Sequence, residues 1–466
     1  MQNEQKYIKY TLDVHKKHIK GGIKTMKKRL ISAFLVSAMC LSLTACGGSG
    51  GSDSGSDGGS SGGSSSGALR VAIWDNNQQP GIQEICDLFT EETGIDVQVE
   101  VKEWDSYWTL LEAGASGGDM PDVFWMHANN SQIYMNNDML LKLDDYIDKS
   151  DKIDMSKYLP QVTALYTYDD SYYAVPKDYD TIALWYNKTM FDDAQMEYPN
   201  ENWTWDDMYE AAKKLTDKDA KKYGYALNVT NDQDSYWNMI YSKGGHVLSE
   251  DHKKSGYDDA NTLKAMDFVG KLLTDVCPPA SVMAETATDV LFESGTVAMI
   301  TQGSWMVPAF KQNEYTAENC DVAMIPYDKD TGIRASICNG LGWAAAASTK
   351  RPDDCWKLIE WLGSEEMQIK QAELGVTMSA YEGTSDAWAG NTDLFDLTAH
   401  LAMAEESTVE GVENMIVEYP FTYNAVKWTS QCQKDLVPAW DDPSQMEDKC
   451  KEFAGTMNDI IASESK

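Results

Sequence analysis

The first part of the folded chain alternates between segments with the pattern of a strand and segments with the pattern of a helix. Residues 69–74, 95–101 and 121–125 have the short apolar or alternating patterns of strands. Between them, residues 81–92 and 104–115 carry apolar side chains at helical spacing. Strand–helix alternation at this spacing predicts parallel βαβ units, and therefore an α/β sheet covered by helices.

Aromatic and polar side chains follow each of these three strands. Trp74-Asp75-Asn76 follows the first strand, Glu103-Trp104 the second and residues 125–129 the third. Open α/β sheets bind ligands at the carboxyl ends of their strands. Because the same residue types recur at the same topological position, the sequence predicts a binding site at this edge of the sheet.

Residues 175–188 form a second informative stretch. After Pro176, the acids Asp178 and Asp180 precede an apolar and aromatic run that is typical of a short, buried strand. A buried carboxylate needs a partner, because an unpaired buried charge is costly. Considered alone, Asp180 fits a turn or capping residue at a loop–strand junction, and a ligand contact is the alternative.

The rest of the chain mixes helix and strand patterns. A hairpin is expected at 166–175, turning at Asp169-Asp170-Ser171. Periodicity predicts further strands and helices, with a mainly helical C-terminal part. The expected strands are 223–227, 296–300, 322–325 and 340–347, and the expected helices are 204–215, 234–241, 261–273, 288–294, 352–362, 365–374, 424–436 and 444–461.

The N-terminus has the features of an export signal. Residues 26–29 are mostly basic, residues 30–43 are apolar, and Thr44-Ala45-Cys46-Gly47 looks like the lipobox of bacterial lipoproteins. The resemblance implies cleavage before Cys46 and lipid on Cys46, so residues 26–45 are predicted to be a lipoprotein signal peptide. An ordinary secretory signal with a chance cysteine is the alternative. Residues 1–25 are interpreted as an upstream extension.

After Cys46, residues 47–67 contain only Gly, Ser and Asp and are expected to form a flexible tether. Without residues 1–45 the chain holds 30 basic and 72 acidic residues, a net charge of −42. Such a surface repels nucleic acid and anionic lipid headgroups, so neither is an expected partner. We expect a protein held at the membrane by its lipid alone.

Seven cysteines follow Cys46, and no two of them form a CxxC pair. An odd number of scattered cysteines predicts buried free thiols rather than a disulfide framework. A Cys320–Cys338 pair is compatible with the sequence, because spacing alone does not decide it.

Five segments in a fixed order are similar to those of the extracellular sugar-binding proteins of bacterial ABC importers, the group that includes maltodextrin-binding protein. The segments are Pro121–Trp125, Pro176–Lys188, Trp203–Asp207, Leu291–Trp305 (with its Gly303-Ser304-Trp305) and Asn339–Trp343. The resemblance covers residues 68–466. It implies a two-lobe periplasmic-binding-protein fold of type II, in which two α/β domains are joined by a hinge of crossing segments and close over a ligand.

The resemblance also implies where the lobes and crossings lie. Lobe 1 is expected to comprise residues 68–182 and 340–377, and lobe 2 residues 183–339 and 378–466. The crossings are expected near 180–184, 339–343 and 376–380.

Matching positions imply a set of ligand-binding residues. Carboxylates and amides bind sugar hydroxyls, and aromatic rings cover the apolar faces of sugars. Two groups follow from the match, with Trp343 also fitting a core position. The first is Asp180, Trp305, Trp125, Asn129 and Tyr236, and the second is Asp75, Asn76, Asp178, Trp343 and Trp428. Ala128-Asn129 departs from the acidic-then-basic pair of maltodextrin-binding protein.

The resemblance therefore implies a monomeric extracellular lipoprotein that captures a carbohydrate, expected to be an oligosaccharide, and delivers it to an ABC transporter permease. It would be anchored on the outer face of a Gram-positive type of cell membrane. No cofactor, metal or catalytic residue is expected, because no motif for one occurs in a suitable context. The alternatives are a secreted glycoside-active enzyme and a binding protein for a charged solute, such as a phosphorylated polyol or a polyamine. An adhesin is a further possibility.

Overall fold

The computed structural model describes residues 67–229 and 233–464. The predicted upstream extension 1–25, the signal peptide 26–45, and Cys46 with the tether as far as residue 66 lie outside the described residues. Within the described part, no helix is long and apolar enough to cross a membrane.

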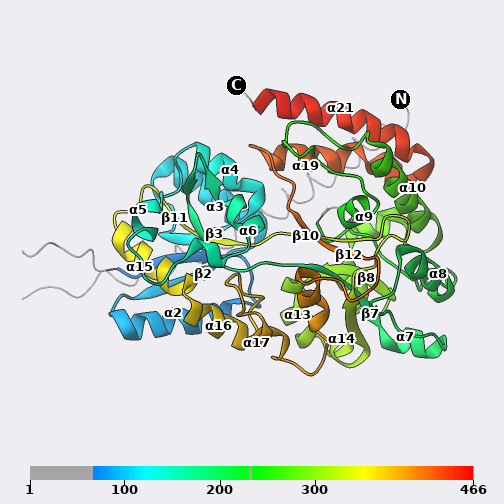
Figure 1. Ribbon diagram of the computed structural model, residues 1–466, viewed down its shortest axis with the longest axis horizontal. Helices are drawn as coiled ribbons and strands as arrows, with labels where there is room; N and C mark the ends of the chain where they lie inside the picture. Colours follow the sequence, from blue (N-terminus) through cyan, green and yellow to red (C-terminus); the bar gives the residue numbers. More distant parts are fainter. Residues whose placement is uncertain (1–66, 230–232, 465–466) are drawn as a thin grey trace, which may run out of the picture. The chain divides into compact units, whose positions relative to one another are not determined.

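A five-stranded sheet carries the first predicted strands, in the order β2-β1-β3-β11-β6 (Figure 1). β1 pairs in parallel with β2 and β3, which confirms the topology predicted from the strand–helix alternation. β11, from a distant part of the chain, is antiparallel to β3 and β6. The bounds are β1 Leu69–Ile73, β2 Val97–Val101, β3 Val123–Met126, β6 Ala174–Pro176 and β11 Gly342–Ala345.

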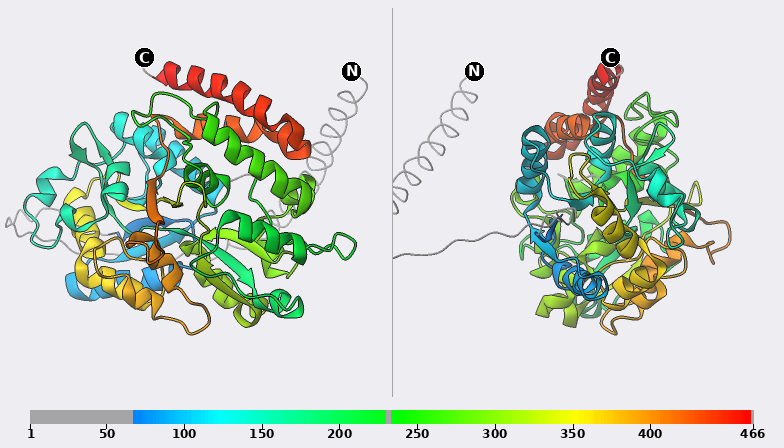
Figure 2. Two further views of the ribbon diagram at one scale, coloured as in Figure 1. Left: turned by 45° about the vertical axis from the view of Figure 1, so that its right-hand side comes forward. Right: turned by 90° about the vertical axis from the view of Figure 1, so that its left-hand side faces the viewer.

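Helices pack against this sheet and against each other. In α2 the buried side chains include Ile82, Ile85 and Phe89, which are the residues whose spacing predicted the helix. α2 ends at Gly94, which has the left-handed conformation (φ 72°) common after a helix. α16 lies against α2 (Figure 2). The bounds are α2 Gln79–Thr93, α3 Trp104–Gly117, α4 Ala128–Asn136, α5 Asp144–Ile147, α6 Pro160–Leu165, α15 Pro352–Gly363 and α16 Glu365–Glu373.

A hairpin of β4 (Thr167–Tyr168) and β5 (Ser171–Tyr172) confirms the predicted turn. Asp169 and Asp170 both have positive φ, 49° and 55°. Aspartate tolerates this left-handed region better than most residues, which explains its use in the turn.

The second group of strands is built around β7 (Ile182–Asn187), the strand predicted within 175–188. All six of its residues are buried, and β7 lies between β8 and β9, antiparallel to both. Beside it, β10 pairs in parallel with β12 over six residues. The other bounds are β8 Met299–Gly303, β9 Cys320–Met324, β10 Ile333–Cys338 and β12 Glu413–Glu418.

The remaining helices surround these strands (Figure 1). The N-cap of α8 is Thr204, the first residue of the expected helix 204–215, and the side chains of Thr204 and Asp207 cap one another's backbone N–H groups. The bounds are α7 Lys188–Asp193, α8 Trp205–Leu215, α9 Tyr236–Ser242, α10 Ala260–Asp275, α11 Ala280–Glu285, α12 Thr288–Glu293, α13 Val307–Gln312, α14 Glu314–Asn319, α17 Asp386–Ala389, α18 Thr398–Leu401, α19 Ala425–Asp435, α20 Val437–Asp441 and α21 Met446–Glu464. Short 3-10 turns occupy Met155–Lys157, Ser304–Met306, Ala402–Ala404 and Pro443–Gln445.

Two strand predictions are wrong in detail. The expected strand 223–227 forms only isolated bridges, from Tyr223 to Val297 and from Ala226 to Ile300. The expected strand 296–300 begins later, as β8 (Met299–Gly303). β12 was not expected, since the C-terminal part was predicted to be mainly helical.

Three distant segments lie side by side between the two groups of strands. The Lys177 N–H donates to the Leu341 carbonyl at 2.7 Å, and the Asp180 N–H donates to the Asn339 carbonyl at 2.8 Å. Asp178 also forms a β-bridge with Ser379. These segments coincide with the expected crossings, and the lobe limits at 182, 339 and 377 remain a prediction.

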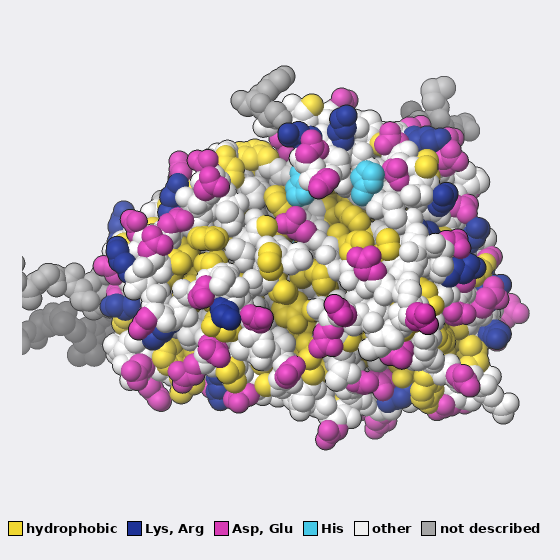
Figure 3. Space-filling model, in the orientation of Figure 1, with side chains coloured by type: hydrophobic (Ala, Val, Ile, Leu, Met, Phe, Trp, Pro, Cys, Tyr) yellow, Lys and Arg dark blue, Asp and Glu magenta, His cyan; other side chains and the backbone are white. Residues whose placement is uncertain are grey.

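The cysteines of the described part are free and buried: Cys86, Cys277, Cys320, Cys338, Cys355, Cys432 and Cys450. This confirms the expectation of buried thiols and excludes the Cys320–Cys338 pair. Acidic side chains are spread over the face seen in Figure 3, in keeping with the excess of acids in the sequence.

Candidate functional site

A cavity of about 430 Å³ opens where the crossing segments meet the carboxyl ends of β1 and β3. Its volume lies within the range of small-molecule sites. Rings, carboxylates and amides predominate among the sixteen side chains that line it. They are Trp74, Asp75, Gln78, Trp104, His127, Asn129, Asp178, Asp180, Gln233, Trp305, Asn339, Leu341, Thr377, Tyr419, Thr429 and Gln433.

Aromatic rings form one wall of the cavity. Trp74 follows β1, and Trp104 begins α3; their rings meet edge to face with centroids 5.0 Å apart. Trp104 is 40% exposed although it is large and apolar. An exposed ring held by a second ring is a ready surface for the apolar face of a ligand.

Trp305 supplies a ring from the second group of elements. It lies in the 3-10 turn after β8, and its indole covers Gly303. A Cβ at Gly303 would lie 1.8 Å from Trp305 Cζ3. Only glycine fits beneath the ring, which gives a physical reason for the Gly-Ser-Trp sequence.

Asp75 is held by a relay of hydrogen bonds. Its Oδ1 accepts from the Asn77 N–H at 2.7 Å, and its Oδ2 accepts from Gln78 Nε2 at 3.0 Å. Gln78 Oε1 in turn accepts from Lys177 Nζ at 2.9 Å. The relay fixes the orientation of the Asp75 carboxylate at the cavity wall.

Asp178 joins two crossing segments. Its Oδ1 accepts from the Leu341 N–H at 2.7 Å, and its Oδ2 pairs with the Lys177 ammonium. Lys177 is fully buried and also lies over the Trp125 ring, 4.6 Å from its centroid. A buried lysine with these partners neutralises Asp178, so we assign the pair a structural role at the crossing.

Asp180 keeps one oxygen for the cavity. Its Oδ1 accepts from the Asn339 N–H at 3.0 Å and from Gln233 Nε2 at 2.6 Å. Its Oδ2 accepts no hydrogen bond from the described part of the chain. Desolvation raises the pKa of Asp180 well above its ordinary value, and the two hydrogen bonds oppose that rise. Asp180 is thus both a junction acid and a candidate ligand contact.

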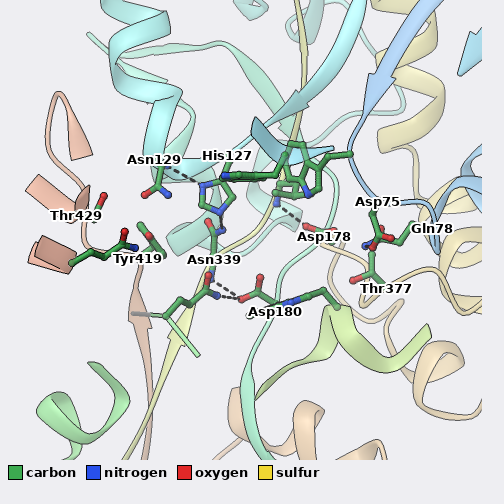
Figure 4. A pocket seen from close by; sticks show the side chains of 16 residues that line it. Asp75, Gln78, His127, Asn129, Asp178, Asp180, Asn339, Thr377, Tyr419 and Thr429 are labelled. Carbon is green, nitrogen blue, oxygen red and sulfur yellow. Dashed lines mark hydrogen bonds between the residues drawn. The ribbon is translucent and has the colours of Figure 1, made fainter. Parts of the chain in front are cut away.

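His127 occupies the middle of the site (Figure 4). Its Nδ1 accepts from the Asn129 N–H at 3.1 Å, its Nε2 lies 2.7 Å from Asn339 Nδ2, and its ring meets Tyr419 edge to face at 5.7 Å. Desolvation lowers the pKa of His127 to about 3. The imidazole is therefore neutral at physiological pH.

The structure brings five of the ten residues predicted to bind ligand to this cavity: Asp75, Asn129, Asp178, Asp180 and Trp305. Their contact with a ligand remains a prediction.

The other five do not line this cavity. Trp125 and Trp343 are fully buried and pack together, with ring centroids 6.0 Å apart. Tyr236 and Trp428 are buried in the second group of elements; the Trp428 indole N–H donates to Thr422 Oγ1 at 3.1 Å. Asn76 is exposed outside the lining.

Sequence reasoning did not select several lining residues. Trp104 and His127 lie in the segments at the ends of the predicted strands. Trp125 was selected there as the aromatic contact, and His127 was not. Asn339 lay within the segment expected to cross between the lobes and was not selected as a ligand contact. Tyr419 carried no signal, because the strand before it was not predicted.

No group of three or more His, Cys, Asp or Glu side chains within residues 67–229 and 233–464 could hold a metal ion. The lining instead suits hydrogen bonding to an uncharged polar ligand, with rings on both sides.

Comparison with known proteins gives a consistent result. The model of a family described as bacterial extracellular solute-binding protein matches residues 75–369. The maltotriose-binding protein of Pyrococcus abyssi is 24% identical over 314 residues, which are 66% of this chain and 65% of that protein.

Two solved structures share the fold. The ABC substrate-binding protein of Listeria monocytogenes in complex with cycloalternan is 21% identical, with a TM-score of 0.75, over 85% of this chain and 99% of that one. UgpB of Mycobacterium tuberculosis in complex with glycerophosphocholine is 15% identical, with a TM-score of 0.71, over 86% and 99%. These likenesses confirm the predicted two-lobe fold of type II.

Proposed function

Since the chain belongs to the bacterial extracellular solute-binding proteins and serves an ABC importer, we propose that its solute is a carbohydrate, expected to be an oligosaccharide, bound in the cavity between the crossing segments. The proposal includes delivery of the sugar to the permease and attachment to the outer face of the cell membrane through lipid on Cys46. A monomer suffices for these steps.

The lining of the cavity carries the proposal. None of its sixteen residues is Lys or Arg, while three are Asp and four are Trp or Tyr. The lysine beside the cavity, Lys177, is already paired with Asp178. A phosphate or carboxylate ligand would meet acids without a free cation, whereas a sugar offers hydroxyls to the carboxylates and amides and apolar faces to the rings.

The polar groups left without a partner support the same ligand class. Asn129 Oδ1 and Asn339 Oδ1 are buried and have no hydrogen-bond partner within the described residues. An unsatisfied buried polar atom is costly, and sugar hydroxyls could satisfy both.

A thermal-shift screen tests the proposal. Purified protein is melted with mono- and oligosaccharides, including maltotriose and cycloalternan, and with glycerophosphocholine and a polyamine. A ligand at 100 times its Kd stabilises the protein by about 2.7 kcal/mol. If a charged solute raises the melting temperature and no carbohydrate does, the carbohydrate assignment fails.

Product analysis addresses the enzyme alternative. The sugar that raises the melting temperature is incubated with the protein and then separated by chromatography. We expect heat of binding in calorimetry and unchanged sugar. Turnover into shorter sugars would overturn the binding-protein proposal.

Lipid attachment needs its own test. Cells that express the full chain are fed a fatty acid with a clickable tag. We expect label in the wild type and none in Cys46→Ala, with release of the variant from the membrane fraction. Equal labelling of both proteins would exclude Cys46 as the anchor.

A further inference from the structure

His127 and Asn339 meet at the cavity with two nitrogens facing each other. Nε2 of His127 lies 2.7 Å from Nδ2 of Asn339. An amide nitrogen is a donor and never an acceptor. A hydrogen bond between these two atoms would therefore require an unprotonated Nε2.

The other ring nitrogen of His127 decides which tautomer is present. Nδ1 lies 3.1 Å from the backbone nitrogen of Asn129, whose N–H donates to it. A backbone N–H is always a donor, so Nδ1 carries no proton. A neutral imidazole without a proton on Nδ1 carries it on Nε2. The Nε2–H of His127 and the side-chain amide nitrogen of Asn339 are then two donors that face each other.

Asn339 gives independent evidence for the same mismatch. Its Oδ1 is buried and has no partner within the described residues, and the residue is 2% exposed. The main chain of Asn339 is fixed, because its N–H donates to Asp180 Oδ1 at 3.0 Å and its carbonyl accepts from the Asp180 N–H at 2.8 Å. Only the amide group is left to turn.

A half-turn of the Asn339 amide removes the mismatch. The oxygen and nitrogen of an amide have nearly the same shape, so their positions are assigned from the hydrogen-bond network. After the half-turn, Oδ1 faces the Nε2–H of His127 at the same short separation. The amide nitrogen of Asn339 then occupies the position in which the buried Oδ1 had no hydrogen-bond partner within the described residues.

We infer that His127, as its Nε2–H tautomer, donates to Asn339 Oδ1 and thereby makes the Asn339 amide nitrogen the group offered to the ligand. His127 is then a positioning residue that sets the specificity of the cavity. As far as the ligand is concerned, the inference rests on the proposed function.

The assignment specifies the chemistry of the ligand at this position. The Asn339 amide nitrogen needs an acceptor. A sugar hydroxyl accepts from it and can also donate to a neighbouring carboxylate of the lining. An ionised phosphate or carboxylate would accept from the amide but would bring its negative charge against the acids of the same lining. The Asn339 amide and the acidic lining together therefore select polyhydroxylated ligands over anions.

Nuclear magnetic resonance tests the tautomer without any ligand. Long-range proton–nitrogen correlation spectra of histidine-labelled protein distinguish protonated from bare ring nitrogens, and His127→Gln identifies the His127 signals by their loss. We expect Nε2–H and bare Nδ1 in the ligand-free protein at neutral pH. A proton on Nδ1, on its own or with one on Nε2, would overturn the inference.

Two variants test the positioning role. His127→Gln keeps an amide nitrogen near the position of Nε2, whereas His127→Asn keeps a polar atom only near Nδ1. With maltotriose as the probe, or cycloalternan if maltotriose does not bind, we expect the Asn variant to bind about 2- to 10-fold more weakly than the Gln variant. Equal affinities in two folded variants would contradict the role. If no carbohydrate binds the wild type, the proposed function fails, and the tautomer spectrum still decides this inference.

Discussion

The side-chain amide of Asn137 donates to the hydroxyl of Tyr423 at 3.0 Å, across 286 residues of sequence. Asn137 is the C-cap of α4, which follows β3 of the first sheet, and Tyr423 precedes α19 of the second group. On another side of the cavity, Gln312 Nε2 lies 3.3 Å from Asn77 Oδ1. Both contacts join the two groups of elements outside the crossing segments, so they are available only when the two groups are close together.

Removal of the Tyr423 hydroxyl should weaken ligand binding although Tyr423 does not line the cavity. A bond present only in the closed state favours that state, and a ligand that binds the closed state gains the same free energy. We expect Tyr423→Phe to raise Kd by about two- to fivefold, mainly through faster dissociation, because one hydrogen bond contributes on the order of 1 kcal/mol. Stopped-flow fluorescence measures both rates.

Tyr198→Phe is the matched control for this prediction. The Tyr198 hydroxyl donates to Asp192, six residues away within the second group, at 2.7 Å. Its loss should leave Kd unchanged. An unchanged Kd in Tyr423→Phe as well would mean that the Asn137 contact does not influence closure.

Trp104→Ala should reduce affinity, at some cost in the stability of the ligand-free protein. The Trp104 residue is 40% exposed, so its removal gives up the buried part of the ring and its edge-to-face contact with Trp74. Loss of an aromatic wall for the sugar should cost about tenfold or more in Kd. Calorimetric titration and thermal melting measure the two quantities. Tyr198→Ala, at a comparably exposed ring away from the cavity, is the control, and a similar loss of affinity there would argue against a specific wall.

Asp180→Ala and Asp180→Asn should differ in stability. The Asp180 carboxylate accepts from two donors at the crossing, so Ala removes the acceptor of the Asn339 N–H and of Gln233 Nε2. We expect Ala to lower the free energy of unfolding by about 1–3 kcal/mol.

Asn at position 180 keeps an acceptor for these donors and should retain most of the stability. It cannot accept two hydroxyls as a carboxylate does, so ligand affinity should still fall. Urea titration of the three proteins gives the unfolding free energies. If Ala and Asn destabilise equally, the two hydrogen bonds do not support the crossing.

The sequence predicted the parts of the fold that local patterns determine. β1, α2 and β7 have periodic apolar residues and clear ends, and all three occur where they were expected. β12 was missed because Glu413–Glu418 becomes a strand only through its pairing with β10, and no local pattern contains that partner. The same omission hid Tyr419, which follows β12 directly.

The candidate site was predicted in part for a related reason. Sequence motifs give the position of a residue along the chain but not the face on which its side chain lies. Trp125 and His127 are two residues apart near the end of β3; the tryptophan is buried against Trp343, and the histidine reaches the cavity. Asp178 and Asp180 are also two apart, yet the Asp178 carboxylate is paired with a buried lysine that the sequence could not place.

Glu418 should make the stability of the protein depend on pH. This carboxylate lies on β12 beside a second cavity lined by Tyr241, His246, Glu250 and His252, and its Oε2 is 3.8 Å from His252 Nε2. Burial raises the pKa of Glu418 from 4.5 to about 7. The folded state therefore holds the proton more tightly than the unfolded state, and stability falls as pH rises from about 4.5 to about 7.

Glu418→Gln should remove this dependence. This pKa shift corresponds to at most about 3 kcal/mol of unfolding free energy, before the partial exposure of the side chain is considered. Above pH 7 we therefore expect the unfolding free energy of the variant to exceed that of the wild type by less than this amount. Burial also lowers the pKa of His252, which lies beside Glu418, so the two proteins are compared above pH 7, where His252 is neutral in both. Urea titrations at a series of pH values measure that difference. Glu250→Gln, at an exposed carboxylate of the same cavity, is the control. If the difference in unfolding free energy between Glu418→Gln and the wild type does not change with pH, Glu418 has the same pKa in the folded and unfolded states.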